Sequence, residues 1–363
     1  MAMLSPDAVA PEKPLLALRQ RDVITLAILL AAGGLVRFVL MTHPGYVFDL
    51  DYFFIPWAKQ LQTVPFDRFY TGSGTDVDYP PLYLYVLWGL GKVAGWFSID
   101  LNVDTTRHII PPATNFLFKY PAVIGDLVLA IVVWSLARRR YRSAAPLFAC
   151  GLILFNPPLI YNSAIWGQID SLICLFAVAV IYLLATRRMI LAAVVYALSI
   201  TFKPHMLFML PVFGTVYLMN SRYWEIVISI PAAAGAMLVA LAPFAGSWNP
   251  VAVFVWFSDL LTRMEGKYTY LSMNMWNVWH SLGRVLPSEV ASEDTHKIIS
   301  GLPDSVAQFV PSFHTLGLIL IAIVSRMSPI LQIHRRDEAN IWLGSQIMFL
   351  SFHMLGTRMT DRY

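Results

Sequence analysis

The sequence predicts an all-α protein, a polytopic transmembrane helical bundle of about nine spans with an extracytoplasmic loop that bears juxtamembrane helices. Three observations predict this fold class. Of the 363 residues, 57% are hydrophobic and only 13% are charged, and the mean hydropathy is +0.60. Apolar runs that approach the roughly 20 residues needed to cross a bilayer recur along the chain, and Arg clusters lie between them. This composition excludes a disordered chain, a nucleic-acid partner and a conventional soluble enzyme.

The chain begins with a polar, proline-broken segment, residues 1–22, which we interpret as a cytoplasmic tail. No small-residue cleavage pattern follows the first apolar run, 23–41, so this run is predicted to be a retained span rather than a signal peptide. Residues 23–363 are predicted to form a single membrane-embedded domain. The further predicted spans are 116–137, 145–161, 171–186, 189–202, 205–220, 224–244, 305–325 and 339–355.

The Arg clusters orient these spans, because positive charge favours the cytoplasmic side. If all the clusters are cytoplasmic, the segment 82–97 does not cross and lies in the outer interface as a juxtamembrane helix. The alternative is that 82–97 crosses and a later span is wrongly assigned. The first arrangement gives a first outer loop at 42–115 and a second large outer loop at 245–304. The polar stretches 162–170 and 356–363 then lie on the same, non-cytoplasmic side.

Several catalytic templates are missing from the sequence. It contains no GxxxxGK[ST], GxSxG or HExxH pattern, and its eight histidines do not cluster at metal-ligand spacing. Cys150 and Cys174 lie in apolar stretches, which predicts buried free thiols rather than a disulfide.

Two acidic residues open the segment FDLDYFFIPW at 48–57. Asp49 or Asp51 could be an N-cap of a short helix. Two carboxylates one residue apart exceed what a cap needs. Such a pair suits a general base that takes a proton from an attacking hydroxyl, or a binding pair for a hard divalent cation such as Mg²⁺ or Mn²⁺.

The segment DVDYPPLYLY at 76–85 contains an extended turn fixed by Pro80 and Pro81. Asp78 could simply cap the following helix. In the functional interpretation, Asp78 and Tyr79 line a pocket under the first outer loop, and the sequence leaves both interpretations open.

A polar stretch, FNPPLIYNSAIWGQIDSL at 155–172, interrupts two apolar runs. Its polar side chains, including Gln168 and Asp170, are costly at membrane depth unless they face protein or water, which favours a functional role. Asp126 is a weaker candidate of the same kind, with the alternative that it only satisfies a neighbouring helix.

Several cations are predicted to lie on the outer side, against the usual charge bias. They are Lys203 in FKPH at 202–205, Arg37 near the end of the first span, and Arg358 and Arg362 near the C-terminus. Snorkelling to the interface is one explanation. An anionic ligand such as a polyprenyl-phosphate headgroup is the other.

The segment MEGKYTYLSMNMWNVW at 264–279 combines aromatic rings with amides. Ring faces can stack on a sugar while amides bind its hydroxyls, although an aromatic belt at the membrane interface explains the rings equally well. The residues concerned are Lys267, Asn274, Trp276 and Asn277.

Taken together, these motifs resemble the GT-C superfamily of membrane glycosyltransferases, and most closely prokaryotic relatives of the dolichyl-phosphate glucose and mannose transferases. The resemblance covers most of the chain. It depends chiefly on DYPP at 78–81 followed by NSAIWGQIDS at 162–171, a fairly specific combination in this order.

The resemblance implies an inverting transfer of mannose or glucose from a polyprenyl-phosphate sugar to a glycan or lipid acceptor, at the outer face of the plasma membrane. Asp49 or Asp51 would be the base, and Asp170 or Asp78 a second acidic residue. Asp170 would position the acceptor or, together with Asp49 and Asp51, a metal ion. The implied phosphate contacts are Lys203, Arg358, Arg362 and Arg37. The implied sugar or acceptor contacts are Tyr79, Trp166, Gln168, His205, Lys267, Asn274, Trp276 and Asn277.

The chain departs from the superfamily pattern in three places. The spacing from Asp49 to Trp57 is one residue longer than expected, and residues 359–362 read MTDR instead of MHER. The chain also stops at Tyr363, where relatives continue into further spans, which predicts truncation at the C-terminus. The rival hypotheses are a non-catalytic truncated relative and a lipid or sugar transporter, the latter expected to show inverted repeats.

Overall fold

The computed structural model describes residues 20–45, 49–72, 77–141, 143–267, 277–286, 298, 305, 310–326 and 338–355. These residues are mainly helical, with connecting segments and an isolated bridge between Asp104 and Ile109. The chain forms two compact units, unit 1 from residues 1–56 and 93–175 and unit 2 from residues 57–92 and 176–363. The helices α2 (Ile55–Gln60), α4 (Pro81–Trp96) and α8 (Asp170–Ala185) each contain a boundary between the units.

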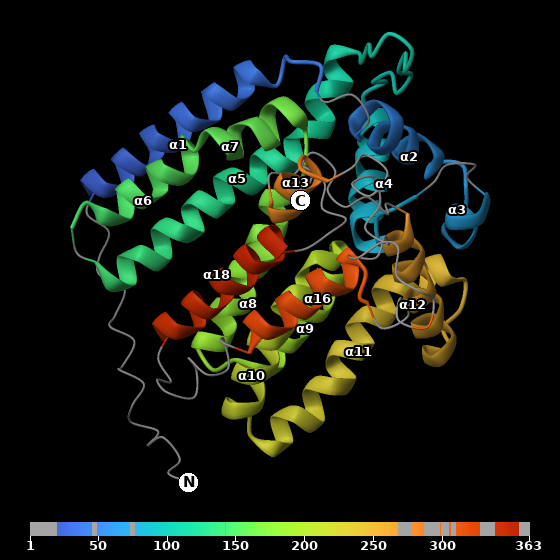
Figure 1. The fold of residues 1–363 in the computed structure, drawn as a ribbon. Helices are drawn as coiled ribbons and strands as arrows, with labels where there is room; N and C mark the ends of the chain where they lie inside the picture. The colour runs from blue at the N-terminus through green and yellow to red at the C-terminus, as the bar shows by residue number, and fades with distance from the viewer. Residues whose placement is uncertain are drawn as a thin grey trace. The chain divides into compact units, whose positions relative to one another are not determined.

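Unit 1 is built around three helices that lie side by side in Figure 1: α1 (Gln20–Leu40), α5 (Pro112–Arg140) and α6 (Ala145–Leu154). The short helix α7 (Pro157–Ile160) continues into a π-helix, η3 (Tyr161–Trp166), and a second π-helix, η2 (Asp49–Phe54), carries the acidic pair. A buried cluster joins α5 to α6 through Ala130, Trp134, Cys150 and Leu154.

The surface of α1 is typical of a membrane helix. Only Gly33 and Arg37 are buried, and a Cβ at Gly33 would lie 3.1 Å from Leu154, so the two helices approach closely there. Large apolar side chains such as Ile28 and Leu35 are more than 60% exposed on this helix. An exposed apolar helix of this length is stable in lipid rather than in water.

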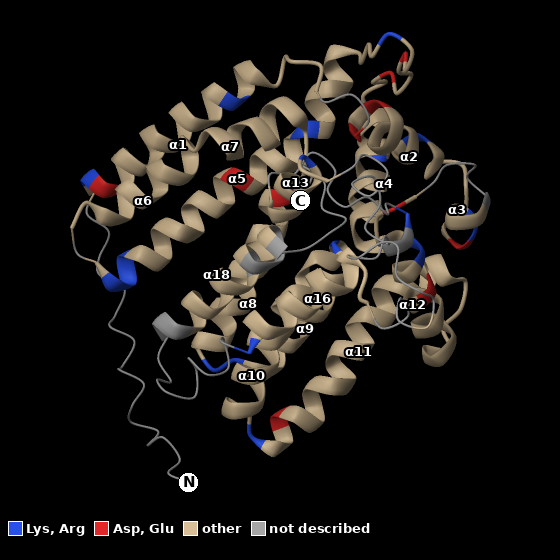
Figure 2. Cartoon of the chain, viewed as in Figure 1, with Lys and Arg blue, Asp and Glu red and all other residues tan. Residues whose placement is uncertain are grey.

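Unit 2 contains α3 (Phe66–Gly72), α9 (Met189–Phe202), α10 (Leu210–Asn220), α11 (Tyr223–Ala245), α12 (Pro250–Gly266), α13 (Val278–Gly283), α16 (Phe313–Ser325) and α18 (Glu338–Leu355). The long helix α11 packs along α9 (Figure 1). Figure 2 shows few Lys, Arg, Asp or Glu residues along these two helices.

Aromatic side chains pack α3 and α4 against α11. Phe66 stacks on Phe244 at 4.7 Å between ring centroids, and Tyr70 meets Phe244 edge-on at 5.8 Å. The hydroxyl of Tyr85 donates a hydrogen bond to the carbonyl of Ala240 at 3.1 Å. These contacts fix the helices on either side of the DYPP turn within unit 2.

By length and composition, three described helices can cross a membrane: α1, α5 and α11. The pair Ala145–Leu154 and Pro157–Trp166, bent by 44°, adds a fourth if it forms one span. The predicted spans 171–186 and 189–202 are helices of 16 and 14 residues, shorter than the roughly 20 residues of an ordinary span. The number of about nine spans and the single membrane-embedded domain therefore stay predictions.

Three details differ from the sequence-based expectations. The segment 205–220 begins as a 3₁₀-helix, Pro204–Met209, before α10 starts. The helix predicted at 305–325 corresponds to α16, which begins at Phe313 and ends at Ser325. Cys150 is buried as predicted, but Cys174 is exposed because it lies on the outer surface of the apolar helix α8.

Candidate active site

The π-helix η3 binds three acidic side chains of unit 1. The Asn162 side-chain amide donates to Asp170 Oδ2 at 2.9 Å, and the Ser163 hydroxyl donates to Asp126 Oδ2 at 2.6 Å. The Trp166 indole N–H donates to Asp49 Oδ2. π-Helices are rare and occur preferentially at functional sites. The polar stretch singled out in the sequence is thus an organising element of a carboxylate cluster.

Arg37 and Asp126 form a buried ion pair between α1 and α5. Arg37 Nε lies 2.7 Å from Asp126 Oδ2, and the two side chains are 0% and 1% exposed. Arg37 Nη1 also donates to the carbonyls of Leu154 at 2.6 Å and Gly33 at 3.2 Å. The structure does not support the predicted contact of Arg37 with a lipid phosphate, because its charge is paired within the protein. The alternative for Asp126, satisfaction of a neighbouring helix, is confirmed.

The two aspartates of η2 are positioned by the residue between them. Leu50 is fully buried and packs against Gly45 and Gly167, where an added Cβ would lie 2.9 Å from its Cδ1 atom in each case. Both glycines have left-handed backbones, with φ of +94° and +92°, which glycine adopts without strain. Leu50 therefore packs tightly against two glycines. Its neighbours Asp49 and Asp51 are buried, with exposed fractions of 2% and 1%.

The π-helical form of η2 gives a physical reason for the unusual spacing in this segment. A π-helix closes its hydrogen bonds from i to i+5, one residue more per turn than an α-helix. A π-helix over Asp49–Phe54, followed directly by α2, is compatible with the predicted extra residue between Asp49 and Trp57.

His108 is a member of this cluster that sequence reasoning missed. Its Nδ1 atom lies 2.7 Å from Asp51 Oδ2. The two residues are 57 positions apart in the sequence, and nothing in the local pattern around His108 signals the contact.

Lys119 and Asn115 also escaped the sequence analysis, and their role is structural. Lys119 Nζ donates to the carbonyl of His43 at 2.5 Å, and Asn115 Nδ2 donates to the carbonyls of Met41 at 2.8 Å and His43 at 2.7 Å. These groups satisfy carbonyls at the C-terminal end of α1. A cation there is favoured by the helix dipole.

In unit 2, the residues of the DYPP turn contact two cations. Asp78 Oδ2 lies 3.1 Å from Lys267 Nζ. The Tyr79 ring lies 5.8 Å from Lys203 Nζ, a cation–π contact, and Lys203 is only 3% exposed. Lys203 follows the last residue of α9 in an extended conformation, as expected before Pro204.

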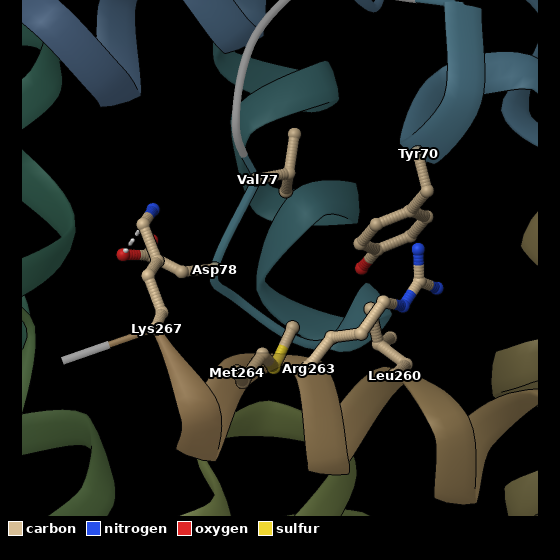
Figure 3. Close-up of a pocket in the computed structure, with 7 residues that line it drawn as sticks. All are labelled: Tyr70, Val77, Asp78, Leu260, Arg263, Met264 and Lys267. Atoms are coloured by element: carbon tan, nitrogen blue, oxygen red, sulfur yellow. Dashed lines mark hydrogen bonds and ion pairs between the residues drawn. The ribbon is translucent and has the colours of Figure 1, made fainter. Parts of the chain in front are cut away.

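A pocket opens beside this turn, as Figure 3 shows. Asp78 and Lys267 lie at one side of it, and Tyr70 and Arg263 at the other (Figure 3). The Tyr70 hydroxyl donates to the carbonyl of Tyr79 at 2.7 Å. Burial, reinforced by the neighbouring Tyr85, raises the pKa of Tyr70 well above its ordinary value, so this hydroxyl stays a donor. The pocket thus presents a carboxylate, two cations and an aromatic ring to a ligand.

The remaining predicted residues fall into two groups. Gln168 is fully buried after η3, His205 lies partly buried in the 3₁₀-helix, and the Asn277 side chain caps α13 by accepting from His280 N at 2.9 Å. This cap accounts for the Asn277 amide oxygen without a sugar. The predicted residues Asn274, Trp276, Arg358 and Arg362 lie outside the described residues.

The acidic residues of the cluster are each bound to a different partner. Among the residues that the structure describes, no group of three or more His, Cys, Asp or Glu side chains is placed to hold a metal ion. The involvement of Mg²⁺ or Mn²⁺ through Asp49, Asp51 and Asp170 stays a prediction.

The helical fold and the carboxylate cluster agree with a membrane-embedded transferase, and comparison with known proteins identifies the family. Residues 57–358 match the ALG6, ALG8 glycosyltransferase family. The chain belongs to this family, and it is a multi-pass integral membrane protein. The resemblance to the GT-C superfamily is thereby confirmed.

Three curated relatives carry related names. A Drosophila melanogaster protein named probable dolichyl pyrophosphate Glc1Man9GlcNAc2 alpha-1,3-glucosyltransferase is 25% identical over 66% of this chain and 48% of its own length. A Caenorhabditis elegans protein, Dolichyl pyrophosphate Glc1Man9GlcNAc2 alpha-1,3-glucosyltransferase, is 23% identical over 92% of this chain and 48% of its length. The Saccharomyces cerevisiae Dolichyl pyrophosphate Man9GlcNAc2 alpha-1,3-glucosyltransferase is 25% identical over 46% of this chain and 32% of its length. The chain spans about half the length, or less, of the curated relatives it matches.

Proposed function

We propose that this protein transfers glucose from a polyprenyl-phosphate carrier to a lipid-linked oligosaccharide. Family membership supports glycosyl transfer. The three relatives are all named glucosyltransferases, which favours glucose over mannose, the other sugar left open by the sequence. The reaction is proposed to occur on the extracytoplasmic face, and the plasma membrane stays a prediction.

The single observation that carries the proposal is the pair of buried aspartates on η2, held by Trp166 and His108. In the proposed reaction, an acceptor hydroxyl oxygen attacks the anomeric carbon, and the bond from that carbon to the phosphate oxygen breaks. The hydroxyl proton passes to the pair Asp49 and Asp51, which we call the acidic centre. The electron pair of the broken bond leaves with the polyprenyl phosphate. A positioned base contributes typically ~10²–10⁴-fold to such a step.

The cations of unit 2 are proposed to bind the anionic parts of the substrates. Lys203 is buried next to the Tyr79 ring, a place where an ammonium group could contact a phosphate in a site shielded from water. Arg358 and Arg362 are proposed to assist from outside the described residues.

The pocket at Asp78 and Lys267 is proposed to bind the acceptor. Its carboxylate can accept hydrogen bonds from sugar hydroxyls, while Lys267 and Arg263 can donate to them, and Tyr70 offers a ring edge. This mixture of donors, acceptors and an aromatic ring is what a carbohydrate needs for orientation.

Turnover of defined donors tests the proposal. Purified protein in lipid would be incubated with a lipid-linked oligosaccharide and either polyprenyl-phosphate glucose or polyprenyl-phosphate mannose, with added Mg²⁺ or Mn²⁺ and with a chelator. We expect glucose transfer that is lost in the Asp49→Asn/Asp51→Asn double variant.

Transfer of mannose alone would contradict the choice of sugar. Binding of the donor without transfer would favour a non-catalytic relative, and movement of the intact donor across the bilayer would favour a transporter.

A further inference from the structure

The proposed reaction does not use the buried ion pair of Arg37 and Asp126. Arg37 Nε lies 2.7 Å from Asp126 Oδ2, and both side chains are shielded from solvent. Moving two charges out of water carries a large desolvation cost, so a buried pair is weak evidence for stability and can instead serve to fix one conformation. The other hydrogen bonds of its two members show which part of unit 1 the pair fixes.

Both members of the pair bind the stretch of chain that leads into the π-helix η3. Arg37 Nη1 donates to the carbonyl of Leu154, the last residue of α6, at 2.6 Å. Asp126 Oδ2 accepts from the hydroxyl of Ser163 at 2.6 Å, and Ser163 belongs to η3. The ion pair therefore holds this stretch at two points, before α7 and within η3.

The hydrogen bond from Ser163 to Asp126 is the link between the ion pair and η3. Ser163 Oγ lies 2.6 Å from the carboxylate oxygen and 2.9 Å from the carbonyl oxygen of Leu159. A hydroxyl has one hydrogen to donate, and an ionised carboxylate forms the shorter and stronger bond. Ser163 is fully buried, so this bond is shielded from bulk solvent.

The same π-helix reaches the acidic centre. The indole N–H of Trp166 donates to Asp49 Oδ2. Ser163 and Trp166 are three positions apart, within one turn of a π-helix, whose hydrogen bonds run from i to i+5. A displacement of η3 at Ser163 is therefore passed to the Trp166 indole. Asp49 and Asp51 also share one turn, that of η2, so a contact that holds Asp49 holds Asp51 with it.

From this geometry we infer that Arg37 and Asp126 act through Ser163 as positioning residues for the acidic centre. They fix η3, and η3 holds the Asp49 carboxylate through the Trp166 indole. Reacting groups must be held in their productive geometry by surrounding hydrogen bonds, and small displacements reduce the rate strongly. The effect on transfer rests on the proposed function, whereas the placement of the Trp166 indole can be observed without turnover.

The indole N–H of Trp166 reports the positioning directly. Its bond to a carboxylate is charge-assisted, and a change in the length or angle of that bond moves the nuclear magnetic resonance signal of the indole group. The full-length protein, labelled at its 11 tryptophans, would be compared with variants in detergent, with Trp166→Phe identifying the signal. We expect Ser163→Ala to shift or broaden this signal and to leave the other indole signals in place, which also shows that the variant is folded.

Thr114→Val is the matched control. Thr114 is a fully buried residue of α5 in the same unit, and its hydroxyl donates to the carbonyl of Asp100, outside the network of Arg37 and Asp126. Valine keeps the shape of the side chain and removes the hydroxyl. We expect the Trp166 signal and the value of kcat to stay unchanged in this variant.

Turnover distinguishes positioning from general packing. With saturating polyprenyl-phosphate glucose and acceptor, we expect the kcat of Ser163→Ala to fall by ~10-fold, with a smaller change in KM. If Ser163 acts through Trp166, the double variant Ser163→Ala/Trp166→Phe turns over at the rate of Trp166→Phe alone. Losses that come from independent packing effects multiply in the double variant instead.

The outcomes separate this inference from the proposed function. If the wild-type protein transfers glucose, the positioning role is overturned when the losses multiply, when kcat is unchanged in Ser163→Ala, or when the Trp166 signal does not move; the proposed function then stands. If the wild-type protein transfers no sugar, the proposed function fails, and the Trp166 signal alone decides the positioning. If Ser163→Ala does not fold, Ser163→Cys replaces it in both measurements, because a thiol is a weaker donor of similar size.

Discussion

The charged side chains in and around the acidic centre of unit 1 are more deeply buried than those in the pocket of unit 2. In unit 1, Arg37, Asp49, Asp51 and Asp126 are each at most 2% exposed, and each has a partner fixed by helix or loop. In unit 2, the Asp78 and Lys267 side chains are 12% and 19% exposed at the edge of an open pocket. A buried charge is costly to leave unpaired, whereas a solvated one is not. The difference is consistent with our proposal that unit 1 holds the reacting groups and that unit 2 binds the acceptor.

The largest expected effect concerns the Arg37–Asp126 ion pair, which joins α1 to α5. Asp126→Leu leaves Arg37 buried without its carboxylate, so we expect the free energy of unfolding to fall by about 3–5 kcal/mol. The measurement is equilibrium or thermal unfolding in detergent. The double variant Arg37→Met/Asp126→Leu removes both charges and should recover most of the loss. A single-variant loss below about 1 kcal/mol would contradict the buried-pair description.

The next effect concerns the hydrogen bond from Trp166 to Asp49. Trp166→Phe keeps an aromatic ring but removes the donor to a buried carboxylate, worth about 1.5–3 kcal/mol. We expect glucose transfer to fall by ~10- to 100-fold, measured as kcat/KM at saturating acceptor. Trp134→Phe is the control, because Trp134 packs in the α5–α6 cluster of the same unit. Equal losses in both variants would show that general packing, and not the hydrogen bond, is responsible.

A smaller effect on stability is expected at Gly45 and Gly167, the glycines that pack against Leu50. Gly167→Ala places a Cβ 2.9 Å from Leu50 on a backbone with φ of +92°, so we expect a loss of about 1–2 kcal/mol in unfolding free energy. Gly34→Ala is the matched control, because nothing lies within 4 Å of its added Cβ inside α1. That control should be neutral or slightly stabilising. A stable Gly167→Ala protein would mean that Leu50 can move freely.

The smallest effect on stability is expected in the pocket. Lys267→Met breaks the contact with Asp78, and partly solvated ion pairs are worth about 0–1 kcal/mol. We expect a change in unfolding free energy within that range, together with a clear rise in KM for the oligosaccharide acceptor. Lys92→Met, which removes a cation lying 5.4 Å from the Trp88 ring, should leave KM unchanged. If the two variants behave alike, the pocket does not bind the acceptor.

The sequence predicted the helical class and the motifs, because both depend on local patterns. The polar stretch at 162–171 was singled out because buried polar groups at membrane depth need partners, and its residues Asn162, Ser163 and Trp166 do bind acidic side chains. The partners themselves come from distant positions: Arg37 is 89 residues from Asp126, and His108 is 57 residues from Asp51. A single sequence carries no signal for such pairs. For this reason Arg37 was assigned to a phosphate and His108 was not assigned at all.

The central claim, that the acidic centre of unit 1 carries the transfer chemistry, is tested most directly by release of polyprenyl phosphate from polyprenyl-phosphate glucose in the presence of acceptor. The wild-type protein, Asp51→Asn and the exposed control Asp67→Asn would be compared at equal amounts of folded protein. We predict release by the wild-type and control proteins and a reduction of at least ~10²-fold in Asp51→Asn. Release by Asp51→Asn and by the Asp49→Asn/Asp51→Asn double variant at the wild-type rate would contradict the claim.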